Sequence, residues 1–322
     1  VFDRNGSNDL LAQAAQYEYN KNGSKARTVF PNGTEEIIAY NEAGYPKSVQ
    51  TKNGTSVLSG YTYEYYRDGN QKRKTDHAGK IVEYEYDNAG KLLSENQGGI
   101  PTPTQITYQY DKFNNRVRTT TSAGQNKQTD YTYDLNNRLL KESEIQTNTA
   151  GATLSERKTY YTYDPNGNTL LRASEEMISA NAGAEAQVSI DDSSDYVREY
   201  RYNAANQLVG YTHGEKNVSY TYRPNGLRNS QAIGEETTRY IWGGDQIVLT
   251  ADGNNQVWEK YTYGAGLISR ESATVAGGSM TARSIYMRNA HGDVVGLTDS
   301  TGAVSKTYDY DAFGNEIAPV PG

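Results

Sequence analysis

The chain has 322 residues, a net charge of −7 at pH 7, no cysteine, and a hydrophobic content of only 35%. The acidic balance argues against nucleic acid as the main partner, because phosphate neutralisation needs a basic surface, and the lack of cysteine excludes a disulfide scaffold. The 29 tyrosines exclude a disordered chain, since disordered segments are poor in aromatic residues. The sequence also has no apolar run of about 18 residues, the length that a membrane-spanning helix needs.

A short unit recurs along the chain, and its clearest copy runs from Tyr84 to Leu93. Successive units are about 20 to 25 residues apart, apart from two longer intervals, and a period of this size indicates a repeat architecture. The units begin at Tyr17, Tyr40, Tyr61, Tyr84, Tyr108, Tyr131, Tyr161, Tyr200, Tyr220, Tyr240, Tyr261, Tyr286 and Tyr308.

Each unit predicts one strand followed by a tight turn. In an extended chain Tyr84 and Tyr86 share one face and Glu85 projects from the other, so one face is lined by tyrosine and the other is solvated. Asp87 suits the first position of a turn, and Gly90 stands where the chain needs a positive φ. We predict that the following residues are structural parts of the repeat: Tyr84, Tyr86, Asp87, Gly90, Tyr108, Tyr110, Tyr131, Tyr133, Tyr161, Tyr163, Gly167, Tyr308, Tyr310, Asp311 and Gly314.

A second set of turns lies about half a period away, for example at Asp76–Gly79, Asp252–Asn255 and Asp299–Gly302. Each repeat therefore supplies two strands, and the predicted fold is all-β, a long antiparallel hairpin ribbon. Because open twisted sheets rarely exceed about ten strands without curling, we expect the ribbon to curl into a spiral or hollow shell, a partial β-cocoon.

The repeats run from the first residues to the last, so residues 1–322 are predicted to be a single array that starts and ends within a larger parent protein. Three stretches depart from the pattern. Gly98–Pro103 is expected to be a loop, and residues 144–158 and 172–195 are expected to be long insertions at hairpin tips, the second with a short helix near Ser174–Glu176.

We predict no catalytic residue, no cofactor and no metal. His77, His213 and His291 stand in or beside turns, and their spacing supplies no partner for catalysis or metal binding. The acidic stretches Asp3–Asp9 and Asp191–Asp195 have enough oxygens for calcium, but neither has the spacing of an EF-hand loop.

Two tryptophans have alternative interpretations. Trp242 and Trp258 are candidate glycan contacts, because exposed aromatic side chains can form platforms for sugars. Trp242 stands two residues after Tyr240, in the position of a second repeat tyrosine, which favours packing on the sheet instead.

The units, with the pattern Y-x-Y-D-x-x-G, resemble the YD repeats of the Rhs family, which occur in bacterial polymorphic toxins, C components of Tc toxins, wall-associated proteins and teneurins. The resemblance covers essentially the whole chain. It is strongest at Arg239–Val248, at His291–Asp299 and at Tyr308–Glu316. The core segment that carries the family's self-cleaving aspartates does not follow within this sequence, so no autoproteolytic residue is carried over.

The resemblance implies a shell that encloses a C-terminal toxin. We therefore expect a non-enzymatic structural segment of a secreted or surface-exposed bacterial protein that encapsulates or displays a C-terminal effector. The alternative is an adhesion or carbohydrate-binding module. Expected partners are the rest of the parent chain with its effector, cell-surface glycans, and further copies that associate through exposed strand edges.

Overall fold

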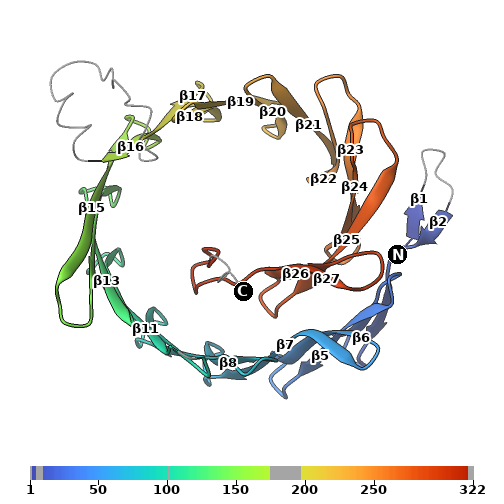
Figure 1. The fold of residues 1–322 in the computed structure, drawn as a ribbon, viewed down its shortest axis with the longest axis horizontal. Helices are drawn as coiled ribbons and strands as arrows, with labels where there is room; N and C mark the ends of the chain where they lie inside the picture. Colours follow the sequence, from blue (N-terminus) through green and yellow to red (C-terminus); the bar gives the residue numbers. More distant parts are fainter. Residues whose placement is uncertain (1, 5–9, 101, 175–196, 318–322) are drawn as a thin grey trace. The chain divides into compact units, whose positions relative to one another are not determined.

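The computed structural model describes residues 2–4, 10–100, 102–174 and 197–317. These residues form strands and turns and no helix, so none of them forms a helix long and apolar enough to cross a membrane. This confirms the predicted all-β class (Figure 1). The chain divides into two compact units: unit 1 contains Val1–Glu85, Gln97–Pro101 and Ile241–Gly322, and unit 2 contains Tyr86–Asn96 and Thr102–Tyr240.

The strands of unit 1 come from the two ends of the sequence. They are β1 (Phe2–Arg4), β2 (Leu10–Gln13), β3 (Gln16–Tyr19), β4 (Lys25–Val29), β5 (Thr34–Tyr40), β6 (Pro46–Asn53), β7 (Ser56–Tyr65), β8 (Gln71–Asp76), β9 (Ile81–Tyr86), β22 (Gln246–Ala251), β23 (Val257–Tyr263), β24 (Leu267–Ala273), β25 (Met280–Arg288), β26 (Val294–Thr298) and β27 (Val304–Thr307).

The strands of unit 2 come from the middle of the sequence, with β10 and β21 running across the division. They are β10 (Leu92–Gly98), β11 (Thr104–Tyr110), β12 (Arg116–Ala123), β13 (Gln125–Tyr133), β14 (Leu139–Thr147), β15 (Thr153–Tyr163), β16 (Thr169–Ser174), β17 (Arg198–Tyr202), β18 (Leu208–His213), β19 (Lys216–Tyr222), β20 (Arg228–Ile233) and β21 (Glu236–Gly243).

The strands β3 to β27 belong to one long sheet in which consecutive strands are neighbours, while β1 and β2 pair with each other apart from it. Every register that the described residues define is antiparallel, as in β11 with β12 and β13 with β14. The sequence prediction of a hairpin ribbon is therefore confirmed.

The pleat produces the predicted difference between the two faces. Along β9 the side chains of Val82 and Tyr84 are buried whereas those of Glu83 and Glu85 are exposed. The same alternation holds in β7, where Tyr63 is buried and both Thr62 and Glu64 are exposed. We call the side of the sheet that carries the repeat tyrosines the tyrosine face.

One predicted insertion is wrong, because residues 144–158 are not a loop. β14 continues to Thr147, β15 begins at Thr153, and the two strands stay paired to the end of the hairpin. A five-residue turn opened by Asn148 joins them, with a positive φ at Gly151. The Thr-rich sequence of this stretch suits exposed strands, since β-branched residues have a high strand propensity.

The second insertion, 172–195, falls mostly outside the described residues, as does the expected helix at Ser174–Glu176 beyond its first residue. Residues 172–174 belong to β16. Gly98 is the last residue of β10, and the described residues Gly99, Ile100, Thr102 and Pro103 lie between β10 and β11, as the predicted loop at Gly98–Pro103 requires.

Candidate functional site

The repeat turns share one hydrogen-bonding scheme, which Asp87 shows clearly. Its side-chain oxygen Oδ1 accepts hydrogen bonds from the backbone N–H groups of Ala89 and Lys91, both at 2.9 Å. The backbone N–H of Gly90 donates to the carbonyl of Asp87 at 3.0 Å, and Gly90 has a φ of 80°. These contacts hold the chain in the conformation that the turn argument requires, with glycine where φ is positive.

The same hydrogen bonds stabilise the ionised form of the turn aspartates. The bond from the Lys91 backbone N–H is the largest cause that lowers the pKa of Asp87 below its usual value. The pKa of Asp134 is lowered in the same way by the backbone N–H of Arg138, and that of Asp164 by the side chain of Asn168. Hydrogen bonds to a carboxylate favour its charged form, so these turns are tightest when the aspartate is ionised.

The last tyrosine of most repeat strands ties its repeat to the preceding one. In β13 the hydroxyl of Tyr133 donates to the backbone carbonyl of Arg116 at 2.9 Å. Arg116 lies two residues before Arg118, the first residue of β12 that pairs with β13. The tyrosine hydroxyl therefore satisfies a carbonyl that the β12–β13 ladder leaves unpaired, as a buried or half-buried carbonyl needs.

This contact recurs in both units with nearly constant geometry. The other hydroxyl-to-carbonyl pairs, at 2.7 to 2.9 Å, are Tyr40 with Lys25, Tyr65 with Pro46, Tyr110 with Leu92, Tyr163 with Leu139, Tyr222 with Leu208, Tyr263 with Ile247 and Tyr310 with Val294. Sequence reasoning placed these tyrosines on one face but missed their partners, because the acceptor is a backbone atom that no residue type marks.

The first tyrosine of a pair is buried in some repeats and half-buried in others. Tyr84 and Tyr108 are buried, with 7% and 4% of their surface exposed. Tyr108 also donates its hydroxyl hydrogen to the carboxylate of Glu95, itself only 1% exposed. Cationic side chains lie over several of these rings, as Arg116 does over Tyr131 with 5.0 Å between guanidinium and ring centroid. Such contacts add to the packing of an aromatic face.

In unit 1 the tyrosine face is covered by the chain itself. The backbone N–H of Ala290 donates to the hydroxyl of Tyr63 at 3.1 Å, and that of Ala265 donates to the hydroxyl of Tyr17 at 3.2 Å. Burial raises the pKa of Tyr61 to about 12 and raises that of Tyr63 as well. Segments more than 220 residues apart in the sequence are thus held together by tyrosine hydroxyls.

Turn residues make further contacts between the first and last strands of unit 1. The side-chain amide of Asn32 donates to the carbonyl of Asp299 at 2.7 Å, and that of Asn53 donates to the carbonyl of Gly302 at 3.3 Å. Lys80 forms an ion pair with Asp309 at 2.6 Å between Nζ and Oδ2. The turn between β26 and β27 therefore contacts the turn between β4 and β5 and the last residue of β6.

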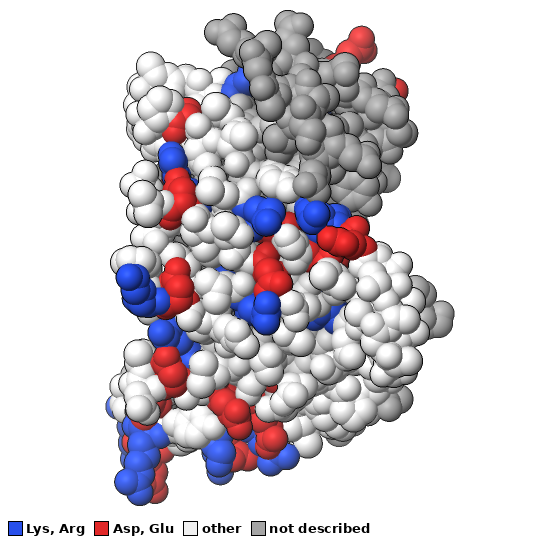
Figure 2. Space-filling model, turned by 90° about the vertical axis from the view of Figure 1, so that its left-hand side faces the viewer, with Lys and Arg blue, Asp and Glu red and all other residues white. Residues whose placement is uncertain are grey.

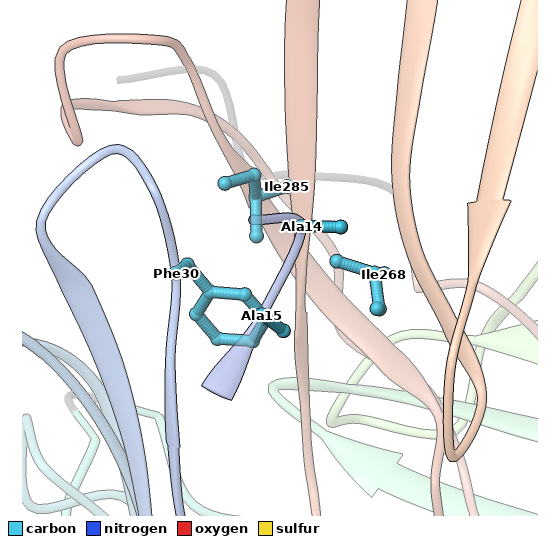
Figure 3. Close-up of a cluster of buried hydrophobic side chains, with 5 residues drawn as sticks. All are labelled: Ala14, Ala15, Phe30, Ile268 and Ile285. Carbon is cyan, nitrogen blue, oxygen red and sulfur yellow. The ribbon is translucent and has the colours of Figure 1, made fainter. Parts of the chain in front are cut away.

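A small apolar cluster lies at the same junction. Figure 3 shows Phe30 facing Ala15, with Ala14, Ile268 and Ile285 around them. Ala14 and Ala15 precede β3, whereas Ile268 and Ile285 belong to β24 and β25. All five residues are at least nine-tenths buried, so the first and last strands share a core.

Charges on the surface are mixed in sign. Figure 2 shows Lys and Arg interspersed with Asp and Glu on the face in view. Several charged side chains pair across neighbouring strands, as Arg118 does with Asp130 and Arg270 with Glu259. A depression of about 450 Å³ on unit 1 is bordered by Lys47, Glu64 and Arg73. Nη1 of Arg73 lies 3.7 Å from Oε1 of Glu64.

The predicted candidates for chemistry do not gather at one place. His77 and His291 are exposed and His213 is half-buried, and within the described residues no group of three or more His, Cys, Asp and Glu side chains could hold a metal ion. Both calcium candidates, Asp3–Asp9 and Asp191–Asp195, lie wholly or mostly outside the described residues. Their ability to bind calcium stays untested.

The two tryptophans lie on different strands of unit 1. Trp258 in β23 has 38% of its surface exposed, while Trp242 in β21 is half-buried. Their predicted contacts with glycans stay a prediction.

Sequence reasoning also missed some turns. Tyr66 opens a turn that closes at Gly69, although its side chain cannot cap the turn as an aspartate does. Asn289 opens another that closes at Gly292, and its spacing of three residues matched the pattern. Both of these missed turns have a glycine with a positive φ at their fourth residue, and that glycine is the signal that could have found them.

Relatives of known sequence match most of the chain. The chain is 28% identical over 308 residues to the tRNA3(Ser)-specific nuclease WapA of Bacillus spizizenii, an alignment that covers 93% of this chain and 11% of that protein. It is 27% identical over 307 residues to the tRNA nuclease WapA of Bacillus subtilis, with the same coverage. The chain therefore spans about a tenth of the length of these relatives. No family model matches the chain.

Two solved structures match nearly all of the chain. The crystal structure of TcdB2-TccC3-Cdc42 has a TM-score of 0.45 and 15% identity, and it covers 94% of this chain and 18% of its own. The Tc holotoxin pore of Photorhabdus luminescens has the same TM-score and coverage at 16% identity.

Proposed function

From the premise that this chain resembles the YD-repeat (Rhs-repeat) family, we propose that it is a wall segment of a shell that encapsulates or displays a C-terminal effector. The observation that carries the proposal is the contact between successive repeats. The repeat tyrosine donates its hydroxyl hydrogen to a backbone carbonyl of the preceding repeat, and the turn aspartate binds backbone N–H groups of its own turn. The motif residues thus serve to join strands into a continuous wall.

The similarity to much longer relatives supports this proposal. The chain spans only about a tenth of the relatives named as tRNA nucleases, so we place any effector activity in other parts of the parent protein. The parent is proposed to be secreted or displayed at the bacterial surface. The segment itself is proposed to be non-enzymatic.

Limited proteolysis of the parent protein tests encapsulation. The C-terminal region should resist proteinase K when it is part of the parent and should be degraded rapidly when it is expressed alone. Degradation at the same rate in both contexts would contradict encapsulation.

Incubation of the purified chain with tRNA tests the non-enzymatic assignment. We expect the tRNA to stay intact on a denaturing gel. Cleavage that co-purifies with the chain and disappears in the His291→Gln variant would show that the assignment is wrong.

A further inference from the structure

Unit 2 carries a row of basic side chains on its tyrosine face. The cross-strand register places Tyr161 opposite Arg172, Arg172 opposite Arg198, Arg198 opposite His213, and His213 opposite Lys216. Directly opposite residues point to the same side of a sheet. Arg172, Arg198, His213 and Lys216 therefore form a continuous line across β16, β17, β18 and β19, which we call the basic row.

This arrangement is costly for the fold alone. Like charges directly opposite each other on neighbouring strands, as Arg172 and Arg198 are, destabilise a sheet. Some other cations of unit 2 have acidic partners, as Arg118 has Asp130. Among the described residues no ion pair includes Arg172, Arg198 or Lys216. Within the part of unit 2 that the structure describes, the basic row is thus a local excess of positive charge, whereas the whole chain has a net charge of −7.

The hydrogen-bonding capacity of the two arginines of the basic row is only partly used. Arg172 donates from Nε to the hydroxyl of Tyr161 at 3.0 Å, and the charge of Glu142 acts on its guanidinium. By contrast, Nε of Arg198 is shielded from solvent and has no hydrogen-bond partner in the described part of the chain. A buried guanidinium nitrogen without a partner is unfavourable unless a ligand supplies an acceptor.

Unit 1 shows what the tyrosine face accepts. There the hydroxyls of Tyr17 and Tyr63 accept hydrogen bonds from backbone N–H groups of an overlying segment, and Lys80 pairs with the carboxylate of Asp309 in the same part of the chain. In unit 1, polypeptide backbone thus contacts the tyrosine hydroxyls, and the acidic side chain of Asp309 pairs with the basic side chain of Lys80. In unit 2 tyrosines adjoin the basic row in the same way, with the rings of Tyr200 and Tyr211 5.3 Å apart.

We propose that the basic row of unit 2 binds an acidic polypeptide segment in extended conformation. Three inter-strand steps of about 4.8 Å give the row a length of about 14 Å, which an extended chain of about five residues spans. This inference deepens the proposed function by naming the chemistry of the polypeptide that the wall contacts.

Fluorescence anisotropy with a fluorescein-labelled decapeptide of glutamate tests the inference on the full chain. We expect binding that weakens as salt rises. The Arg198→Gln/Lys216→Gln variant should bind the peptide about tenfold more weakly, because it loses two cations that pair with the peptide carboxylates. The matched control is Arg118→Gln/Lys127→Gln, which changes the net charge equally but alters cations that already pair with Asp130 and Glu144. It should change the affinity less than twofold.

Several results would overturn the inference. They are equal weakening in both variants, no binding of the glutamate decapeptide at 1 mM, or tighter binding of a heparin-derived oligosaccharide or a DNA oligonucleotide of equal charge. The melting temperature separates binding from a structural role, because loss of like-charge repulsion should leave the temperature unchanged or raise it. A large decrease would assign the row to the fold. None of these results alters the proteolysis test of encapsulation, so the two proposals can fail separately.

Discussion

The bond between Tyr133 and the Arg116 carbonyl can be removed with little other change. Tyr133→Phe deletes one hydroxyl and keeps the ring in the tyrosine face. The carbonyl loses a donor at 2.9 Å. Because Tyr133 is only half-buried and water can partly replace the donor, we expect a cost of about 1 kcal/mol, near the typical net value of a hydrogen bond.

Tyr131→Phe is the matched control for this variant. Tyr131 lies on the same strand and face and is also half-buried, and no described residue forms a hydrogen bond with its hydroxyl. Arg116 lies over its ring, a contact that phenylalanine retains. The control should therefore change the stability by less than about 0.5 kcal/mol, as surface-like substitutions do.

Thermal and urea denaturation measure both variants. A loss of about 1 kcal/mol in a unit of this size corresponds to a decrease of about 2 to 4 °C in melting temperature. Hydrogen exchange at Arg116–Arg118 should accelerate in Tyr133→Phe alone, because the bond closes the end of the β12–β13 ladder. Equal shifts in both variants would refute the assignment of the hydroxyl as a tie between repeats.

Three further changes test the turns. The pKa of Asp87 is lowered by hydrogen bonds from backbone N–H groups of its turn. The ionised carboxylate therefore contributes fully to the unfolding free energy above the unfolded pKa of about 3.9, and this contribution is lost as the pH falls through the lower, folded pKa. Melting temperatures measured between pH 6 and 2 should decline less in Asp87→Asn than in the wild type. Gly302→Ala should lower the unfolding free energy by about 1 to 3 kcal/mol more than Gly314→Ala. Both glycines have a φ near 80°, but only a Cβ at Gly302 would meet a neighbouring atom, the side-chain nitrogen of Asn53 at 2.6 Å. Equal losses of unfolding free energy would contradict the close packing of that turn. Gly90→Val should lower the unfolding free energy by about 1 kcal/mol or more, because a β-branched residue is disfavoured at a positive φ. Glu85→Thr on the exposed face should leave it nearly unchanged. Similar shifts of the melting temperature in both variants would contradict the assignment of the turn and of the exposed face.

The turns were predictable because a positive φ restricts the residue type. Asp111 with Asn114 and Asp311 with Gly314 display that restriction directly in the sequence, and the φ of Asn114 is 69°. The alternation of faces was predictable for a similar reason, since the strand period of two is visible in residue polarity.

The contacts between distant segments were not predictable in this way. The hydrogen bond that the backbone N–H of Ala290 donates to Tyr63 and the contact of Asn32 with Asp299 depend on which strands meet in three dimensions. The stretch 144–158 was misjudged because length beyond the usual period was interpreted as a loop, whereas paired strands can simply grow longer. The basic row follows from register, and register cannot be derived from one strand at a time.

The constancy of the tyrosine bonds has a consequence for protein engineering. Connections that follow the tyrosine strands, such as 87–91 and 134–138, mostly contain five residues, whereas connections at the opposite ends range from Gly124 alone to the stretch between β16 and β17. Only the connections that follow the tyrosine strands must return the chain to a carbonyl at a fixed position. The length of these connections is therefore constrained, whereas the length of the connections at the opposite ends of the strands can vary. A foreign domain should therefore be tolerated between Asn148 and Ala152, and the same domain placed between Asp134 and Arg138 should interrupt the array.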